Sequence, residues 1–396
     1  MNPTFNVPIV CSLLIFAILI IPILTPVCAA STDIKLPYSG SVTDSGFIAT
    51  DGQFIAISKA GSSAPELAIY TVDMKQYATV PLSSDTLKAV GMADGRLFYA
   101  DAGGVFEYTI QTGKKRLIDS TTKPIDKIVA DGDNVVLGCD DPPQNVVLIS
   151  LSKGTNDTVF TSRDWIHGLA IDGDRIMWGC ERVDKGPGRE IHVYTISTGT
   201  DYIIPESKSE NTYGYGDISG DNVVWAMRAK DPDYINGVPV GGVSYDMRLT
   251  NLVSGRTQSV DRSDTAPLTV PFISGDTIAY LKQPSLDYNN YETGVIRTYN
   301  IRTGTFKEFG SKIAFLHAVK GDLIIWGRYS PMSFFATSLN GTLPVVTSLT
   351  PTQSATQIPG TIPENTPTPV SPVSPIAVVS ALAAGVAGYA VLHKRR

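Results

Sequence analysis

Short apolar runs separated by Asp-Gly or Ser-Gly turns recur along the body of the chain. The clearest copy is Gly168–Glu181, G-L-A-I-D-G-D-R-I-M-W-G-C-E, where one apolar run enters the turn and another leaves it toward Trp178. Asp-Gly between two such runs is a strong β-hairpin signal, because a tight hairpin turn needs positive φ at its central residues. Seven copies align on their turn glycines, which are Gly52, Gly95, Gly132, Gly173, Gly220, Gly275 and Gly321.

A second hairpin pattern lies between consecutive copies of the first, for example V-F-E-Y-T-I-Q-T-G-K-K-R-L-I at Val105–Ile118. Each unit therefore has four predicted strands, and the turn glycines are about 37 to 55 residues apart, a period typical of β-propeller blades. A sheet with two apolar faces must pack against neighbours on both sides, and closure into a ring removes the end units. We predict an all-β, seven-bladed β-propeller with four-stranded antiparallel blades; six or eight blades are the alternatives.

Two features of the repeat indicate how the ring is packed and closed. The second strand of each first hairpin has a large residue at one matched position, which predicts packing between blades rather than a ligand cage. These residues are Ile57, Tyr99, Leu137, Trp178, Trp225, Tyr280 and Trp326. Ile34–Pro37, ahead of the first hairpin, is expected to pair into the last blade beside Phe334–Val346 and so close the ring.

The paired motifs D-G-x-x-I/V-x-W/Y and Y-x-I-x-T-G-x-x-x-x-I resemble those of TolB-like β-propeller domains, which are found in secreted and archaeal surface proteins. The resemblance covers Ile34 to about Leu349. It implies the fold but no particular activity, because propellers include binding modules and many classes of enzyme.

The two ends of the chain differ in composition from the body. Residues 1–30 contain a long uncharged apolar run and end in Cys-Ala-Ala, which predicts a signal peptide, with an uncleaved anchor as the alternative. Residues 350–375 are rich in Thr, Ser and Pro and are expected to form an extended stalk. Residues 376–392 are apolar and uncharged, which predicts a transmembrane helix, and residues 393–396 form a basic cytoplasmic tail.

This layout resembles that of surface proteins with a C-terminal sorting signal. It predicts that the propeller, residues 31–349, is displayed outside the cell and anchored in the cytoplasmic membrane. The net charge of −6 and the lack of a Lys/Arg-rich run in the body argue against a nucleic-acid partner. The expected partners are the membrane, through the anchor, and a protein or glycan outside the cell.

Sequence signals for catalysis and for cofactors are weak. The sequence contains no G-x-S-x-G, no H-E-x-x-H and no phosphate-binding glycine loop. His167 and His317 precede the innermost strands of blades four and seven, near the predicted mouth of the propeller. The D-G-D triplets Asp131–Asp133 and Asp172–Asp174 suit the turn itself better than a calcium loop, which needs more oxygen ligands at set spacing. We predict no cofactor, no metal and no catalytic residue.

Long connections in blades four to six are rich in Tyr, Arg and Asp, and Tyr and Arg favour interfaces. The predicted recognition surface consists of Arg182, Asp184, Arg189, Tyr213, Tyr215, Arg228, Tyr234, Tyr245, Tyr288 and Tyr291. The alternative is that these connections only pack on themselves. The predicted function is a non-enzymatic binding module for a protein, glycan or envelope component. The alternatives are a polysaccharide lyase or glycosidase and a purely structural envelope protein.

Two cysteines and two sequons are candidates for covalent modification. Cys139 and Cys180 occupy the same position in consecutive blades, so a disulfide is possible outside the cell. Against it, equivalent points on stacked sheets lie ~10 Å apart, beyond the Cα limit of about 7 Å unless the strand ends converge. Asn156 and Asn340 begin Asn-x-Thr sequons in second-hairpin turns and are possible N-glycosylation sites.

Overall fold

The structure is a computed structural model, in which the chain divides into two units, Met1–Thr352 and Gln353–Arg396. It describes residues of the first unit, in the ranges 33–37, 47–59, 66–82, 87–120, 123–181, 189–208, 212–230, 233–235, 238–240, 244–264, 267–283, 294–313, 315–329 and 332–339. No helix within these ranges is long and apolar enough to cross a membrane. The predicted signal peptide, stalk, transmembrane helix and basic tail lie outside the described residues and stay predictions.

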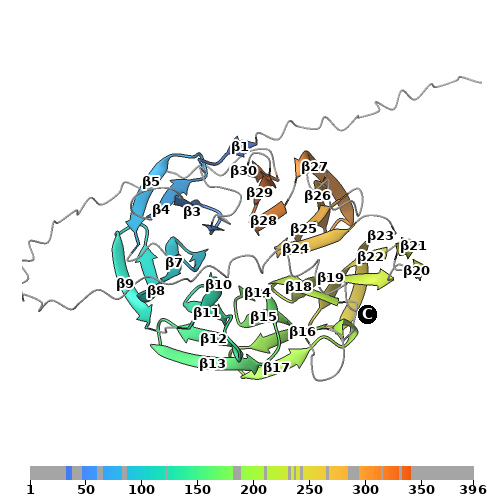
Figure 1. Ribbon diagram of the computed structural model, residues 1–396, viewed down its shortest axis with the longest axis horizontal. Helices are drawn as coiled ribbons and strands as arrows, with labels where there is room; N and C mark the ends of the chain where they lie inside the picture. Colours follow the sequence, from blue (N-terminus) through green and yellow to red (C-terminus); the bar gives the residue numbers. More distant parts are fainter. Residues whose placement is uncertain are drawn as a thin grey trace, which may run out of the picture. The chain divides into compact units, whose positions relative to one another are not determined.

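Within these ranges, seven four-stranded antiparallel sheets follow one another around a ring (Figure 1). Each blade begins with a strand next to the axis, and the following strands lie progressively farther out. Blade one consists of β2 (Ile48–Thr50), β3 (Phe54–Lys59), β4 (Glu66–Thr71) and β5 (Gln76–Pro81). Blade two consists of β6 (Ala89–Ala93), β7 (Arg96–Asp101), β8 (Gly104–Thr109) and β9 (Lys114–Asp119). Blade three consists of β10 (Ile125–Asp131), β11 (Asn134–Cys139), β12 (Gln144–Ser150) and β13 (Thr155–Ser162).

The later blades follow the same order, and within the described residues they carry one short helix and one extra hairpin as insertions. Blade four consists of β14 (Ile166–Asp172), β15 (Arg175–Glu181), β16 (Arg189–Thr195) and β17 (Thr200–Ile203). Blade five consists of β18 (Thr212–Ser219), β19 (Asn222–Lys230), β22 (Ser244–Asn251) and β23 (Arg256–Ser263). Blade six consists of β24 (Leu268–Ser274), β25 (Thr277–Lys282), β26 (Gly294–Asn300) and β27 (Thr305–Ile313). The insertions are the 3-10 helix η2 (Pro205–Ser207) and the hairpin of β20 (Asp233–Ile235) and β21 (Val238–Val240). The seven-bladed propeller predicted from the repeat is confirmed.

Blade seven is completed from both ends of the propeller sequence. Its inner strands are β28 (Phe315–Lys320), β29 (Leu323–Tyr329) and β30 (Met332–Ser338), and its outer strand is β1 (Ile34–Lys35). Ile34 pairs with Ala336, and the backbone N–H of Leu36 donates to the carbonyl of Phe334 at 2.9 Å. The closing strand predicted at Ile34–Pro37 is therefore confirmed, and it joins the two ends of the repeat array without leaving an end blade.

The matched large residues pack between blades, as predicted, and are at most 1% exposed. Trp178 of blade four shares a hydrophobic cluster with Val136 of blade three. Trp225 of blade five likewise clusters with Met177 of blade four. Burial of one such side chain contributes ~1.5–3 kcal/mol, so this position stabilises each junction between blades.

The turns of the first hairpins also connect neighbouring blades. At five of the seven junctions between described blades, the residue before the turn glycine accepts a hydrogen bond from the turn glycine N–H of the next blade. Asp131 Oδ2 accepts from Gly173 at 2.7 Å, and Ser274 Oγ accepts from Gly321 at 2.9 Å. We call these contacts turn bridges, and the others are Asp51–Gly95, Asp172–Gly220 and Ser219–Gly275. The Asp-Gly and Ser-Gly pairs therefore serve both the turn and the packing of the ring.

The second aspartate of each D-G-D triplet has a structural partner as well. Asp174 accepts a hydrogen bond from the Ser197 backbone N–H at 2.8 Å, and Asp133 pairs with Arg96 of blade two at 3.4 Å. Among the described residues, no group of three or more His, Cys, Asp or Glu side chains could hold a metal ion. The carboxylates of the triplets thus take part in hydrogen bonds and ion pairs within the ring.

Both cysteines of the propeller are free and buried, so the disulfide that the sequence allows is not formed in the structure. The two residues belong to β11 and β15, on separate stacked blades. Cys180 Sγ lies 3.5 Å from Ser162 Oγ. Burial raises the pKa of Cys139 to about 11, which keeps this side chain in the thiol form.

Asn156, the first candidate glycosylation site, lies on the outer strand β13 beside the turn and is exposed. Its Nδ2 donates to Asp119 Oδ2 at 2.9 Å. Asn340 lies outside the described residues. Modification of either asparagine stays a prediction.

Candidate binding site at the loop end of the propeller

The first strands of the blades enclose a central cavity of about 600 Å³. A smaller pocket of about 220 Å³ shares Asp126, Lys127 and Leu169 with this cavity, and we call it the mouth pocket. It is lined by residues at the starts of β10 and β14. It therefore lies at the end of the propeller that carries the connections between blades, which we call the loop end, opposite the end of the turn bridges, the turn end.

Irregular first strands shape the loop end. The ladder between the first and second strands is continuous in blades one and two. In blades three to seven it shifts register near the start of the first strand. In β18 the shift lies between Thr212 and Gly216, so Tyr213–Tyr215 leave the ladder. Such irregularities re-aim side chains and are common next to functional sites.

Glycines allow β18 to lie directly against blade four. A Cβ on Gly179 would lie 2.0 Å from the carbonyl oxygen of Gly214, and a Cβ on Gly168 would lie 2.9 Å from the same oxygen. Gly214 itself has a φ of +72°, which favours glycine. This close approach holds Tyr215 beside the mouth pocket, with its ring centroid 5.4 Å from that of His167.

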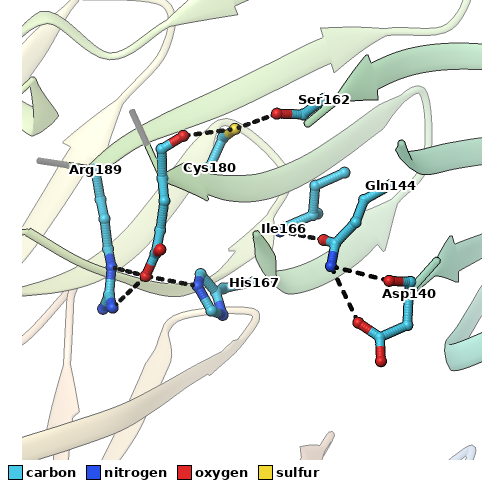
Figure 2. Close-up of polar contacts among 8 residues, drawn as sticks. Asp140, Gln144, Ser162, Ile166, His167, Cys180 and Arg189 are labelled. Carbon is cyan, nitrogen blue, oxygen red and sulfur yellow. Dashed lines mark hydrogen bonds and ion pairs between the residues drawn. The ribbon is translucent and has the colours of Figure 1, made fainter. Parts of the chain in front are cut away.

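A histidine, a glutamate and an arginine form a polar cluster next to the mouth pocket (Figure 2). Glu181 Oε1 accepts hydrogen bonds from His167 Nε2 at 3.2 Å, from Arg189 Nη2 at 2.6 Å and from Arg189 Nε at 3.0 Å. Glu181 ends β15 and Arg189 begins β16, where the two residues face each other in the ladder. Opposite charges at such a position stabilise strand pairing. We call these three residues the His167 cluster.

The electrostatics of the cluster favour a neutral imidazole. Burial is the main cause that lowers the pKa of His167; the Arg189 guanidinium lowers it further, while Glu181 acts in the opposite direction. Because the ring donates its Nε2–H to Glu181, Nδ1 is left as a hydrogen-bond acceptor in the neutral form. The cluster can therefore accept a hydrogen bond from a ligand without changing its charge.

Gln144 fixes the start of β14 to blade three (Figure 2). Its Oε1 accepts a hydrogen bond from the Ile166 backbone N–H at 2.6 Å, and its Nε2 donates to Asp140 Oδ1 at 3.0 Å. The Gln144 side chain is buried and lines the mouth pocket. This wall of the pocket is therefore positioned by a buried side chain and not only by loop conformation.

Two of the described aromatic side chains in this region are exposed. Trp165, directly before β14, is 56% exposed, and Tyr215 of β18 is 44% exposed. Aromatic rings that combine a large apolar area with a polar group are enriched in recognition surfaces. Trp165 was not among the residues predicted from the sequence, because it lies in a short connection between blades three and four.

Of the predicted recognition residues, the structure places Arg189 and Tyr215 close to His167, Arg189 through the shared Glu181 and Tyr215 through a ring contact. Arg228 pairs with Tyr245 across β19 and β22. Tyr245 is only 3% exposed and belongs to the hydrophobic core shared by blades five and six. Its ring is therefore buried and not part of an exposed surface, which corrects the sequence-based expectation for this residue.

The remaining predicted residues cannot be placed in the site. The backbones of Tyr213 and Tyr234 lie on β18 and β20, but their side chains are outside the described part of the chain. Four further residues lie outside it entirely, namely Arg182, Asp184, Tyr288 and Tyr291. A recognition surface spanning blades four to six therefore stays a prediction. Glu181 and Gln144 were not predicted from the sequence, because their positions in the site depend on strand register.

Comparisons with known proteins identify the fold but no family. No protein-family model matches the chain, and no curated protein matches it. Solved structures that match include an oligogalacturonate lyase in complex with manganese, with 11% identity and a TM-score of 0.52 over 73% of this chain and 86% of the lyase. The tricorn protease matches with 15% identity and a TM-score of 0.56 over 77% of this chain and 34% of the protease. The acylaminoacyl peptidase of Pyrococcus horikoshii matches with 9% identity and a TM-score of 0.52 over 76% of this chain and 53% of the peptidase.

Identities this low show the fold alone. Together with the seven sheets, they define the chain as a β-propeller protein. The fold implied by the resemblance to TolB-like domains is thereby confirmed, whereas membership of that family stays a prediction.

Proposed function

We propose that the protein is a non-enzymatic binding module that engages a protein or glycan partner at the loop end of the propeller. The observation that carries this proposal is the mouth pocket, with exposed Tyr215 beside it and the His167 cluster adjoining it. Gln144 and the close contact of β18 with blade four hold this site in place before a partner arrives. Preorganised groups lose little conformational entropy on binding, which favours affinity.

The enzyme alternative receives less support from the site. Glu181 is shared between His167 and Arg189, so its negative charge is already compensated within the cluster. The likeness to an oligogalacturonate lyase is a likeness of fold at 11% identity and carries no argument for lyase activity. We therefore propose that the His167 cluster shapes and orients a binding surface.

Site-specific photo-crosslinking tests the proposal. A photo-reactive residue would replace Tyr215 in the full-length protein in its native envelope, and Val253 would be the matched control. Val253 is 74% exposed in the turn between β22 and β23, so it lies in the same blade at the turn end. We expect a discrete crosslinked product from position 215 and none from position 253. Equal products from both positions would favour a structural envelope role, and none from position 215 would contradict the proposal.

We also propose that the propeller is displayed outside the cell and anchored in the cytoplasmic membrane. The supporting observations are the apolar N-terminal run, the Thr/Ser/Pro-rich segment and the terminal apolar and basic residues. Protease added to intact cells is expected to remove the propeller while a cytoplasmic marker stays intact. A propeller that is digested only after lysis would contradict this location.

A further inference from the structure

The central cavity contains charged groups of both signs that come from different blades. Lys127 extends from β10 in blade three, Asp217 from β18 in blade five, and Lys320 from β28 in blade seven. The cavity volume of about 600 Å³ lies within the range of small-molecule sites, about 300–1,000 Å³. Asp126 and Asp172 also line the cavity, with Asp126 near Gly138 of β11 and Asp172 bonded to the Gly220 N–H, and most of the other lining residues are apolar. The cavity thus combines an enclosing wall with a few polar groups, as small-molecule sites do.

Asp217 is held in a fixed position by two blades. Its Oδ1 accepts a hydrogen bond from the Ile218 backbone N–H at 2.9 Å, and its Oδ2 accepts one from the Ile273 N–H of blade six, also at 2.9 Å. Burial is the main cause that raises the pKa of Asp217 to about 6, against the effect of these bonds and of Lys127 and Lys320. A carboxylate in this environment is fixed in space and only partly compensated in charge.

Lys127 has no close counter-ion in the part of the chain that the structure describes. Among the described residues, no carboxylate oxygen lies within 4.0 Å of its ammonium group. The neighbouring Asp126 is turned toward β11, since a Cβ on Gly138 would lie 2.8 Å from Asp126 Oδ1. Partial desolvation in the cavity lowers the pKa of Lys127, although its side chain is reached by solvent, and Asp217 is the main group acting in the opposite direction. Lys127 and Asp217 therefore interact electrostatically within the cavity without forming an ion pair.

His317 adds a neutral group to the same wall. Its Nε2–H donates to the carbonyl of Ile48 at 3.0 Å, and burial is the main cause that lowers its pKa. The ring is therefore uncharged near neutral pH, with Nδ1 as an acceptor. His317 therefore makes the cavity wall more polar, but it compensates neither the charge of Lys127 nor that of Asp217.

We propose that the central cavity binds a small zwitterion, an amino acid in the simplest case, whose carboxylate pairs with Lys127 and whose ammonium group pairs with Asp217. A simple anion would compensate Lys127 but face the carboxylate of Asp217, and a simple cation would compensate Asp217 but face the ammonium of Lys127. A molecule with both groups compensates both charges at once. This site adjoins the mouth pocket and shares Lys127 with it, but the proposal does not depend on a partner binding there.

Isothermal titration calorimetry of the purified full-length protein near neutral pH tests the proposal. The probes are the standard amino acids, each at about 10 mM, with acetate and methylammonium as single-charge controls. We expect at least one amino acid to bind about tenfold or more tightly than either control ion. Lys127→Met should weaken this binding at least tenfold, whereas Lys153→Met, at an exposed lysine in the turn between β12 and β13, should not change it.

Asp217→Asn should also weaken binding, and Asp131→Asn is its matched control. Both aspartates accept a hydrogen bond from the next blade, but Asp131 does not line the cavity. Lys127→Met removes no hydrogen bond between described residues, so it remains informative if Asp217→Asn fails to fold. The proposal is overturned if no amino acid binds, if acetate or methylammonium binds as tightly as the best amino acid, or if Lys127→Met binds like the wild type.

Discussion

The turn end and the loop end of the propeller are built from the same seven blades, but they differ in how closely they follow the repeat. At the turn end one type of hydrogen bond recurs, from a turn glycine N–H to the Asp or Ser of the preceding blade. At the loop end the ladder between the first and second strands shifts register in blades three to seven, and the polar contacts around His167 and Gln144 lie in blades three and four. Recurring residues hold the ring together, and residues that depart from the repeat form the candidate site.

The glycine that follows the matched large residue shows this difference at one position. In blade three, a Cβ on Gly138 would lie 2.8 Å from the Asp126 carboxylate; in blade seven, a Cβ on Gly327 would lie 2.1 Å from the Phe315 ring. In blade four, a Cβ on Gly179 would lie 2.0 Å from backbone. A side chain can rotate away from an added methyl group, whereas two backbones in contact must separate. Blade four therefore tolerates the least change at this position.

Replacement of Gly179 by Ala should have the largest effect on stability. The new Cβ would lie 2.0 Å from the carbonyl oxygen of Gly214, so β18 must shift away from blade four. We expect the free energy of unfolding to fall by about 3 kcal/mol or more, measured by chemical denaturation. The matched control is Gly173→Ala in the turn of the same blade, where φ is +56° but nothing lies within 4 Å of the added atom. It should cost only about 1 kcal/mol, and equal losses in the two variants would show that the close contact is unimportant.

Glu181→Gln should have the next largest effect, and the effect should depend on pH. The variant removes the charge that Arg189 and His167 share, at an expected cost of about 1–2 kcal/mol near neutral pH. Because Glu181 raises the pKa of His167, its loss should lower that pKa further below 6.5. The unfolded chain then binds the proton first as the pH falls, so the variant should lose additional stability relative to the wild type below a pH of about 6.5.

Denaturation of both proteins at pH values of about 8 and 5.5, together with an NMR titration of the His167 ring, measures this effect. Groups whose pKa is raised, such as Asp217, are present in both proteins and cancel in the comparison. Glu206→Gln, at an exposed residue of η2 in the same blade, is the control and should change neither quantity. An unchanged or raised His167 pKa in Glu181→Gln would disprove the assigned role of Glu181.

Asp131→Ala should have a smaller effect, because it removes one turn bridge at the exposed turn end. The Gly173 N–H would lose its acceptor at 2.7 Å but could bond to water. We expect a loss of about 1 kcal/mol in the free energy of unfolding. Asp157→Ala, at an exposed position of β13, is the control and should change stability by less than about 0.5 kcal/mol. If the two variants are equally stable, the turn bridges do not stabilise the ring.

The repeat allowed the fold to be predicted in detail, because each strand pair is local and each turn has its own signal. The seven blades, the closing strand at Ile34 and the burial of residues such as Trp178 follow from periodicity alone. The site could be predicted only in part. Arg189 and Tyr215 were predicted from their residue types. Tyr245 was also predicted but is buried in the core, because the register of β22 determines which face of the sheet its side chain occupies.

Tyr215→Ala should have the smallest effect on stability and the most specific effect on function. The Tyr215 ring is 44% exposed, and its centroid lies 5.4 Å from that of the His167 ring. We therefore expect the free energy of unfolding to change by less than about 0.5 kcal/mol. Tyr202→Ala is the matched control, because Tyr202 is 43% exposed on the outer strand β17. With a photo-reactive residue at position 165 as the reporter, Tyr215→Ala should abolish the crosslinked partner and Tyr202→Ala should leave it unchanged. A partner captured equally in both variants would place recognition away from the mouth pocket, and the functional difference between the two ends of the propeller would then lack support.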